Sequence, residues 1–322
     1  MYESNILEDI KKVDTVYIAA HINPDGDAVG STFSFALAVK SLGKKPVILL
    51  DDFDKRFIIL KGKEFLYSEN YDELAPELFI SLDCASKERL GNAEAIFDRA
   101  TTTYNIDHHI SNTNYAQNNI VNGGASSACE VVYEVIQSFV DIDIDIASAL
   151  YTGILTDTGG FTHNSTSERT HQIAGKLVSI GVDTPFIHSK ILMEHTYTQV
   201  KVFEKALKNI VIDDGVCYTT LTLSEMAECG ATTSDLDGIV SYILNINGVG
   251  VSLFATEREN SLVKLSFRSR TIDVNEVAGL YGGGGHILAA GAGVVGKDIN
   301  ILVTEVVEQL KTRLKDYEKQ SK

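Results

Sequence analysis

The sequence predicts an α/β protein in which a doubly wound, mostly parallel sheet forms a first domain and a second, smaller α/β domain follows. Short apolar runs alternate with longer segments of helical periodicity, which is the pattern of strand-helix-strand units. The chain has 322 residues, more than one hydrophobic core usually organises. Two α/β domains are therefore expected.

The first domain opens with a predicted strand over 15–20 and a helix over 28–42. Gly43 follows this helix, where a C-terminal glycine belongs. A capping box from Ser165 to Glu168 and an N-cap at Asp183 are expected farther along. Three more strands are predicted at 46–50, 78–82 and 102–106, and four more helices at 128–139, 145–155, 168–180 and 184–193.

A helical connector is expected over 194–210, since this polar segment lacks glycine and proline and keeps apolar residues at helical spacing. It separates a first domain over 1–193 from a second over 211–322. Strands are predicted in the second domain at 216–221, 249–256 and 262–269, and helices at 236–244, from Asp273, and along the amphipathic C-terminal segment that carries Val303, Val306, Val307, Leu310 and Leu314.

Composition limits the classes of function. The formal net charge of −16 argues against extended binding of nucleic acid, so a nucleotide substrate should be short. The acidic N-terminus lacks the pattern of a secretory signal, and no apolar run reaches the roughly 18 residues of a membrane span, so we expect a cytoplasmic protein without a membrane partner. The cysteines show no C-x-x-C spacing and are expected to be reduced.

Acidic and imidazole side chains gather where the predicted strands end. In parallel sheets, ligands bind beyond the carboxyl ends of the strands. The clusters are His21 with Asp25 and Asp27, then Asp83, then Asp107-His108-His109; Asp157 follows in a later helical segment.

These residue types suit two neighbouring divalent ions. Such a pair, about 3.5–4 Å apart, activates water and neutralises charge on phosphoryl oxygens. Asp83 is suited to bridge the ions, and His108 with Asp157 to complete the second site. Mixed imidazole and carboxylate ligands favour Mn²⁺, with Co²⁺, Fe²⁺ or Zn²⁺ as alternatives. Asp107 either binds metal or orients His108, and each residue taken singly is also explained as a cap, turn or core residue.

Further candidates lie outside these clusters. Arg268 offers a bidentate fork for phosphate, and the glycine run before His286 allows backbone N–H groups to approach an anion. A mobile loop and a surface ion pair are the structural alternatives. Additional candidates for supporting roles are Ser111, Asn112, His163 and the loop over 123–127 at a helix N-terminus.

Together these residues resemble the DHH phosphoesterase superfamily, specifically its two-domain members with a DHH-associated domain, of the nanoRNase and 3′-phosphoadenosine-5′-phosphate (pAp) phosphatase type. The first motif of the family is matched over 21–31, its eponymous motif at Asp107-His108-His109, and its glycine-rich motif over 282–286. The resemblance implies one Mn²⁺ on His21, Asp25 and Asp83 and another on Asp27, Asp83, His108 and Asp157. It implies Asp83, His108 and His109 as catalytic residues, and substrate binding by His109, Arg268, Gly283, Gly284, Gly285 and His286.

The expected activity is a manganese-dependent phosphohydrolase that degrades short RNA oligonucleotides to mononucleotides and dephosphorylates pAp. A phosphodiesterase for cyclic or linear dinucleotides shares every expected metal ligand and is the main alternative. An inorganic pyrophosphatase, a RecJ-like exonuclease and a nucleotide-binding regulatory module without turnover are the others. The expected partners are short RNA, pAp or dinucleotides, and a homodimer is left open.

Overall fold

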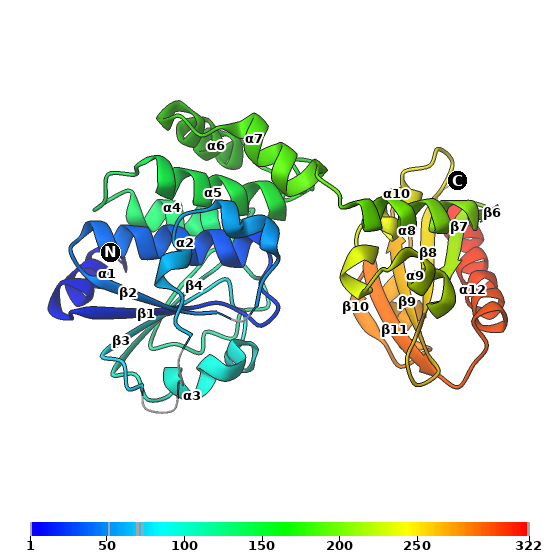
Figure 1. Cartoon of the computed structure of the whole chain (residues 1–322), viewed down its shortest axis with the longest axis horizontal. Coiled ribbons are helices and arrows are strands. Elements are labelled where there is room, and N and C mark those ends of the chain that lie inside the picture. The colour runs from blue at the N-terminus through cyan, green and yellow to red at the C-terminus, as the bar shows by residue number, and fades with distance from the viewer. Residues whose placement is uncertain (1, 51, 69–70, 72–73, 321–322) are drawn as a thin grey trace. The chain divides into compact units, whose positions relative to one another are not determined.

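The chain folds into two compact units, Met1–Glu194 and His195–Lys322. The computed structural model, shown in Figure 1, describes residues 2–50, 52–68, 71 and 74–320. Each unit contains one sheet covered by helices, which confirms the predicted α/β class. The segment predicted as a connector contains helix α8 (Tyr197–Lys208), and all of it except Glu194 belongs to the second unit.

The sheet of the first unit is parallel throughout, with strand order β2-β1-β3-β4-β5. Its central strand β3 is buried at every position, because helices cover the sheet on each side. Ile18 in β1 pairs with Ile48 and Ile80 on its two neighbours. The strands are β1 (Thr15–Ala19), β2 (Lys45–Leu49), β3 (Leu78–Leu82), β4 (Thr102–Asp107) and β5 (Asn118–Val121), the last of which was not predicted.

Helices α2, α4 and α5 lie together on one side of this sheet, with α6 and α7 beyond them, while α3 lies on the other side (Figure 1). Separate clusters of buried apolar side chains fill the two sides. The helices are α1 (Tyr2–Lys12), α2 (Gly26–Ser41), α3 (Glu94–Phe97), α4 (Ala128–Ile136), α5 (Ile144–Asp157), α6 (Glu168–Ile180) and α7 (Thr184–His188), with 3-10 turns at Lys55–Ile59, Lys63–Phe65 and Lys87–Ala93 and a π turn at Ser189–Met193.

The capping residue of α6 differs from the prediction. Ser167, rather than Ser165, is the N-cap, and its hydroxyl accepts from the backbone N–H of Thr170 while the Thr170 hydroxyl bonds back to the Ser167 N–H. Ser167 adopts the extended backbone that a cap requires, and Glu168 is already the first helical residue. The predicted N-cap at Asp183 is confirmed, since its carboxylate accepts from the Phe186 N–H at 3.0 Å.

The second unit contains a mixed sheet of order β10-β11-β9-β8-β7-β6. Helices α11 and α12 pack on one face, and α8, α9 and α10 contribute to the apolar clusters on the other. The strands are β6 (Val211–Asp213), β7 (Val216–Leu221), β8 (Val251–Arg258), β9 (Leu262–Ser269), β10 (Gly284–His286) and β11 (Ala289–Val295); the helices are α9 (Leu223–Cys229), a 3-10 turn (Thr233–Leu236), α10 (Ile239–Leu244), α11 (Val274–Gly279) and α12 (Ile299–Gln320).

Several predictions for this unit need correction. Strand β8 spans Val251–Arg258 where 249–256 was predicted, and β6 and β11 were not predicted. The helix predicted over 236–244 starts at Ile239, because Gly238 has φ +86° and interrupts the helical path after the 3-10 turn. The glycine run was predicted as a loop, whereas Gly284–His286 forms an edge strand paired with Ala289–Gly291. In the part of the chain that the structure describes, no helix has the length and apolar character needed to cross a membrane.

Candidate metal centre

The imidazole and carboxylate clusters meet at one edge of the first sheet. His21 lies two residues beyond β1, Asp83 directly follows β3, and Asp107 is the last residue of β4. Because β1, β3 and β4 are parallel neighbours, their carboxyl ends deliver these side chains to a single location. The expectation from strand ends therefore holds in space as well as in sequence.

The N-terminus of α2 supplies two more carboxylates. Asp25 is the N-cap of this helix, where its Oδ1 accepts from the backbone N–H groups of Asp27 and Ala28 at 3.0 and 3.1 Å. Asp27 in the first turn is 1 % exposed, and its carboxylate accepts from the N–H groups of Ala128 and Cys129 at 2.5 and 2.9 Å. The free N–H groups at the start of α4 thus fix the position of Asp27.

Close approach of α2 and α5 brings Asp157, the last residue of α5, into the same site. A Cβ on Gly30 would lie 2.6 Å from the backbone oxygen of Ala149, and one on Gly26 would contact the side chain of Thr156. Only a glycine fits where two helix backbones approach this closely. Gly26 and Gly30 lie in the motif matched over 21–31, whereas Gly153 was missed by sequence reasoning.

Three groups of potential ligands result among the described residues. His21, Asp25 and Asp83 form the first, Asp27, His108 and Asp157 the second, and Asp83, Asp107, His108 and His109 the third; within each group one atom per residue lies within 4.8 Å of the others. The His108 Nε2 atom lies 3.5 Å from Asp157 Oδ2 and 3.8 Å from Asp27 Oδ2. The first two groups consist of residues that the family resemblance assigns to the two metal ions, and the third joins Asp83 and His108 to Asp107 and His109.

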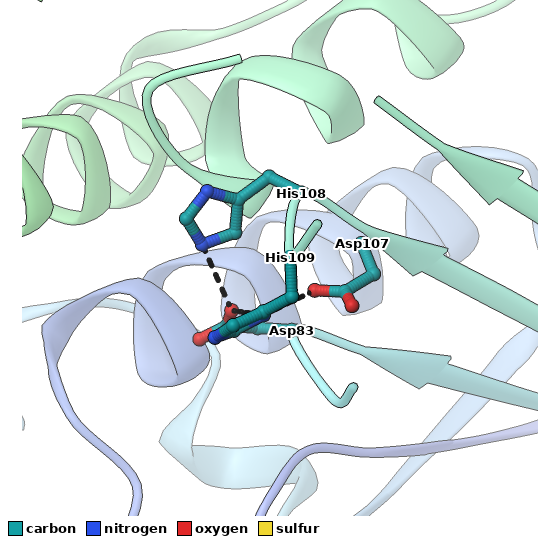
Figure 2. Close-up of side chains that lie close together, drawn as sticks. All are labelled: Asp83, Asp107, His108 and His109. Carbon is teal, nitrogen blue, oxygen red and sulfur yellow. Dashed lines mark hydrogen bonds and ion pairs between the residues drawn. The ribbon is translucent and has the colours of Figure 1, made fainter. Parts of the chain in front are cut away.

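Asp83 lies between the imidazoles of the first and second groups and directs a different oxygen toward each. Its Oδ2 lies 3.5 Å from His21 Nε2, and its Oδ1 lies 3.5 Å from His108 Nε2, as Figure 2 shows for His108. Its backbone has φ +49°, and the residue is 2 % exposed. Among the described side chains, Asp83 Oδ1 is one of the few buried polar atoms with no hydrogen-bond partner. A buried carboxylate oxygen without a donor, surrounded by imidazole and carboxylate atoms, fits a cation site.

The shifted pKa values of this site indicate that several negative charges lie close together. Burial raises the pKa of Asp27 well above its ordinary value, and Asp83 and Asp157 raise it further. Burial also raises the pKa of Asp157, to about 6. For His108 burial acts in the opposite direction, but the nearby carboxylates outweigh it and raise the pKa to about 10. Without a metal ion, these side chains therefore tend to bind protons, which offset the negative charge of the carboxylates. Divalent cations would offset the same charge.

Asp107 contacts His109 and not His108. Its Oδ1 lies 2.8 Å from His109 Nδ1 (Figure 2), and its Oδ2 accepts from Asn112 Nδ2 at 2.5 Å. The hypothesis that Asp107 orients His108 is therefore wrong. The reason is geometric: Asp107 is fully buried beneath the turn, on the side to which the ring of His109 folds back. With Asp107 accepting, His109 Nδ1 carries the proton and Nε2 is the atom left for another partner.

A buried polar network supports this turn. Asn112 also donates to the Asn105 side-chain oxygen at 2.8 Å, and Asn105 donates to Ser81 Oγ and to the Tyr115 hydroxyl. Asn105, Ser81 and Tyr115 were missed by sequence reasoning, because their partners lie on other strands or loops. Asn112 was among the predicted supporting residues, and its side-chain amide donates a hydrogen bond to Asp107.

Two further sequence candidates have other contacts. The loop over 123–127 was predicted to face phosphate. However, the first N–H groups of the helix that follows it donate hydrogen bonds to the carboxylate of Asp27. The His163 Nδ1 atom lies 2.9 Å from the backbone oxygen of Asp157, and its ring covers Gly159.

The candidate residues of the second unit lie near one another. Ala289 in β11 pairs with His286 on one side and with Arg268 on the other, so these two are at the same level of the sheet, two strands apart. That separation is about 10 Å. A Cβ on Gly283 or Gly285 would contact the backbone of β11, so both positions require glycine.

Comparison with known proteins gives two family matches. Residues 15–154 match the model of the DHH family, N-terminal domain, and residues 213–318 match that of the DHHA1 domain. A protein of Thermus thermophilus named bifunctional oligoribonuclease and PAP phosphatase NrnA is 30% identical over 313 residues, covering 96% of this chain and 93% of the relative. The protein of the same name from Bacillus subtilis is 27% identical, covering 98% and 100%.

Solved structures agree on the fold. An exopolyphosphatase-related protein from Bacteroides fragilis superposes with a TM-score of 0.89 at 25% identity, covering 98% of this chain and 97% of that one. An exonuclease RecJ bound to manganese gives a TM-score of 0.56 at 12% identity, covering 97% and 94%. The second likeness is informative for the fold alone.

Proposed function

Because the chain belongs to the DHH family and also carries a DHHA1 domain, we propose that it is a metal-dependent phosphohydrolase that degrades short RNA oligonucleotides to mononucleotides and removes a phosphate from pAp. The observation that carries this proposal is Asp83, whose two oxygens face the imidazoles of two separate ligand groups. One bridging carboxylate between two groups of ligands is the arrangement of a two-metal phosphoesterase.

The ligands would divide as the groups do. His21, Asp25 and Asp83 would hold one ion, and Asp27, Asp83, His108 and Asp157 the other. Mn²⁺ suits this mixture of nitrogen and oxygen donors. Two such ions, when bound, supply a water of lowered pKa and positive charge opposite the phosphoryl oxygens. The hydrogen bonds to Asp25 and Asp27 hold these carboxylates ready before any ion arrives.

His109 would contact the phosphoryl group that is hydrolysed. Asp107 holds the proton on Nδ1 and raises the pKa of His109, an effect that outweighs burial of the ring. The side chain is 41% exposed, so Nε2 is accessible to a substrate. A protonated imidazole in this position donates a hydrogen bond to a phosphoryl oxygen and stabilises the charge that develops there.

The second unit would bind the remainder of the substrate. Arg268 offers two parallel N–H groups to a phosphate, and His286 offers a ring nitrogen about 10 Å away along the sheet. Gly283, Gly284 and Gly285 lack side chains, so the backbone of this strand is open to an anion or a base. We assign these residues to substrate binding and not to hydrolysis.

Product analysis of the Mn²⁺-loaded protein tests the proposal. The substrates are pAp, RNA of two to about twenty nucleotides, linear and cyclic diadenylate, and pyrophosphate, a range chosen because all are phosphoryl compounds that such a metal pair can attack. Release of mononucleotides from the shortest RNAs, with cleavage of pAp, is the expected result. Preference for a diadenylate or for pyrophosphate would reassign the substrate.

One test variant and one control variant are included in this assay. Asp83→Asn keeps the shape of the side chain and removes the bridging charge, so it should lose activity on every substrate. Asp98→Asn is the matched control, since Asp98 is an exposed carboxylate that pairs with Lys87 away from the ligand groups. If the protein retains its metals, binds nucleotide and releases no product, it is a binding module and the proposal fails.

A further inference from the structure

The imidazole of His109 and the carboxylate of Asp83 meet from two different strand ends. His109 Nδ1 lies 3.7 Å from Asp83 Oδ1 and 2.8 Å from Asp107 Oδ1 (Figure 2). Asp83 directly follows β3, and His109 lies two residues beyond β4, so both are outside the paired part of their strands. The separation of the two side chains therefore depends on what joins the two turns.

Asn105 is a side chain that reaches both turns. It lies on β4 and is fully buried, so its amide must be satisfied within the protein. Its Nδ2 lies 3.2 Å from the backbone oxygen of Cys84, the residue after Asp83. Its Oδ1 accepts from Asn112 Nδ2 at 2.8 Å. One buried amide thus contacts the turn that carries Asp83 and the turn that follows His109.

The direction of these hydrogen bonds is fixed by groups that only accept. The backbone oxygen of Cys84 accepts at one end, and the carboxylate of Asp107 accepts at the other. Asn105 must therefore turn its N–H₂ group toward Cys84 and its oxygen toward Asn112. Asn112 must turn its N–H₂ group toward the oxygens of Asn105 and Asp107. A half-turn of either amide would place acceptor against acceptor, so each amide has a single favourable orientation.

Backbone hydrogen bonds also join the turns, but they do not orient the carboxylate of Asp107. The Asp83 N–H, for example, donates to the Ile106 oxygen at 3.0 Å, which fixes the main chain alone. Within the described residues, the Asp107 carboxylate hydrogen-bonds to His109 and to Asn112. Its orientation, and with it the ring of His109, therefore depends on the chain of amides.

We propose that Asn105 is a positioning residue that holds the imidazole of His109 in place beside Asp83. This inference rests on the proposed function, in which His109 contacts the phosphoryl group and Asp83 binds both ions. Asn105 contacts neither substrate nor metal in this assignment and acts through Asn112 and Asp107. An imidazole whose ring is fixed before substrate arrives loses less freedom in the transition state.

Asn105→Asp is the main test variant, because it keeps the shape of the side chain and replaces the N–H₂ group with an acceptor. The Cys84 oxygen then faces an acceptor, and the chain of amides loses its fixed direction. Asn105→Ser is the second variant, used if a buried carboxylate prevents folding; it is neutral and too short to reach both Cys84 and Asn112. Asn112→Ala interrupts the same chain one step nearer to Asp107.

Asn119→Ala is the matched control. Asn119 pairs with Asn105 on the neighbouring strand β5, and its amide donates to the backbone oxygens of Asn114 and Ala116. The change therefore removes a comparable side-chain amide from the same region and leaves the contacts of Asp107 in place. Urea unfolding of each variant measures its stability.

Proton NMR of the metal-free, full-length protein with nitrogen-labelled histidine reports the position of His109 without turnover. The Nδ1 proton that Asp107 accepts should give a downfield, slowly exchanging signal, identified by its absence in His109→Asn. The Asn105 variants and Asn112→Ala should lose this signal, and Asn119→Ala should keep it. Because no metal or substrate is present, the result is valid even if the protein hydrolyses none of the substrates tested.

Steady-state kinetics of the Mn²⁺-loaded protein supply the second measurement. The Asn105 variants and Asn112→Ala should lower kcat about 10–100-fold on both RNA and pAp, with KM and bound metal little changed. A residue of merely structural importance would lower the stability and not the kcat of the folded protein. An unchanged signal and kcat in the Asn105 variants overturn the inference, even if Asn112→Ala has an effect, because Asp107 is then oriented without Asn105.

Discussion

Gly153 in α5 faces the carboxylate of Asp27 in α2, and a Cβ at Gly153 would lie 2.8 Å from Asp27 Oδ1. The same Cβ would also contact the sulfur of Cys129 in α4. Three helices thus meet at a position that has no space for a methyl group. The carboxylate of Asp27 keeps its hydrogen bonds to the N-terminus of α4 only while this position remains glycine.

Gly153→Ala should therefore weaken both the fold and the metal site. Overpacking of this kind typically costs about 1–3 kcal/mol of unfolding free energy. Displacement of Asp27 should also weaken Mn²⁺ binding. Urea unfolding and a Mn²⁺ titration measure the two effects.

Gly175→Ala in α6 is the matched control, because a Cβ there meets no atom within 4 Å. In a helix interior this change should raise the unfolding free energy by about 0.5–1 kcal/mol. Equal effects of the two substitutions on metal affinity would contradict the role assigned to Gly153.

Asp83→Ala should disturb both ligand groups at once. Loss of even an outer hydrogen-bond partner costs about 10–100-fold in metal affinity or activity, so loss of the shared carboxylate should lower kcat by at least about 100-fold. Steady-state kinetics and metal analysis of the purified variant test this. Near-normal kcat with full metal occupancy would show that Asp83 does not bridge.

Metal binding at neutral pH should release protons. The pKa of His108 is raised to about 10 in the metal-free site, so the imidazole is protonated at pH 7 and must lose that proton to bind an ion. Metal affinity should consequently rise as pH increases toward 10. Calorimetry in buffers of different ionisation enthalpy measures the protons released, and identical enthalpies in all buffers would refute the prediction.

Asp107→Asn should reduce turnover without emptying the metal site. The change removes the negative charge that holds the His109 proton on Nδ1, and a loss of about 10–100-fold in kcat is expected. His109→Asn provides the comparison: in the double variant the two losses should not add, because both act through one imidazole. Additive losses, or loss of bound metal, would place Asp107 in another role.

His286→Ala should act mainly on substrate binding. A hydrogen bond to a charged group contributes about 1.5–3 kcal/mol, so KM should rise about tenfold or more while kcat and metal content change little. The exposed position of His286 on an edge strand makes a large loss of stability unexpected. A protein that folds but loses its metals would contradict the assignment.

Much of the fold follows from local pattern. Strands β3, β7 and β9 and helix α6 begin and end at the predicted residues, because each has a continuous or alternating apolar pattern with clear boundaries. The missed strands lack such a pattern: β5 and β6 are short, partly exposed edge strands, β10 consists of two glycines and a histidine, and β11 is rich in alanine and glycine. Edge strands of this kind depend on a partner strand and not on their own composition.

The sequence by itself determined which side chains gather at the strand ends, since a parallel sheet places those ends together whatever the packing around them. It did not determine that Asp107 bonds to His109, that Asp83 turns one oxygen to His21 and the other to His108, or that the amides of α4 hold Asp27. These relationships join residues up to 102 positions apart along the chain. Only tertiary packing decides them, because the direction of a side chain depends on the atoms that surround it in space.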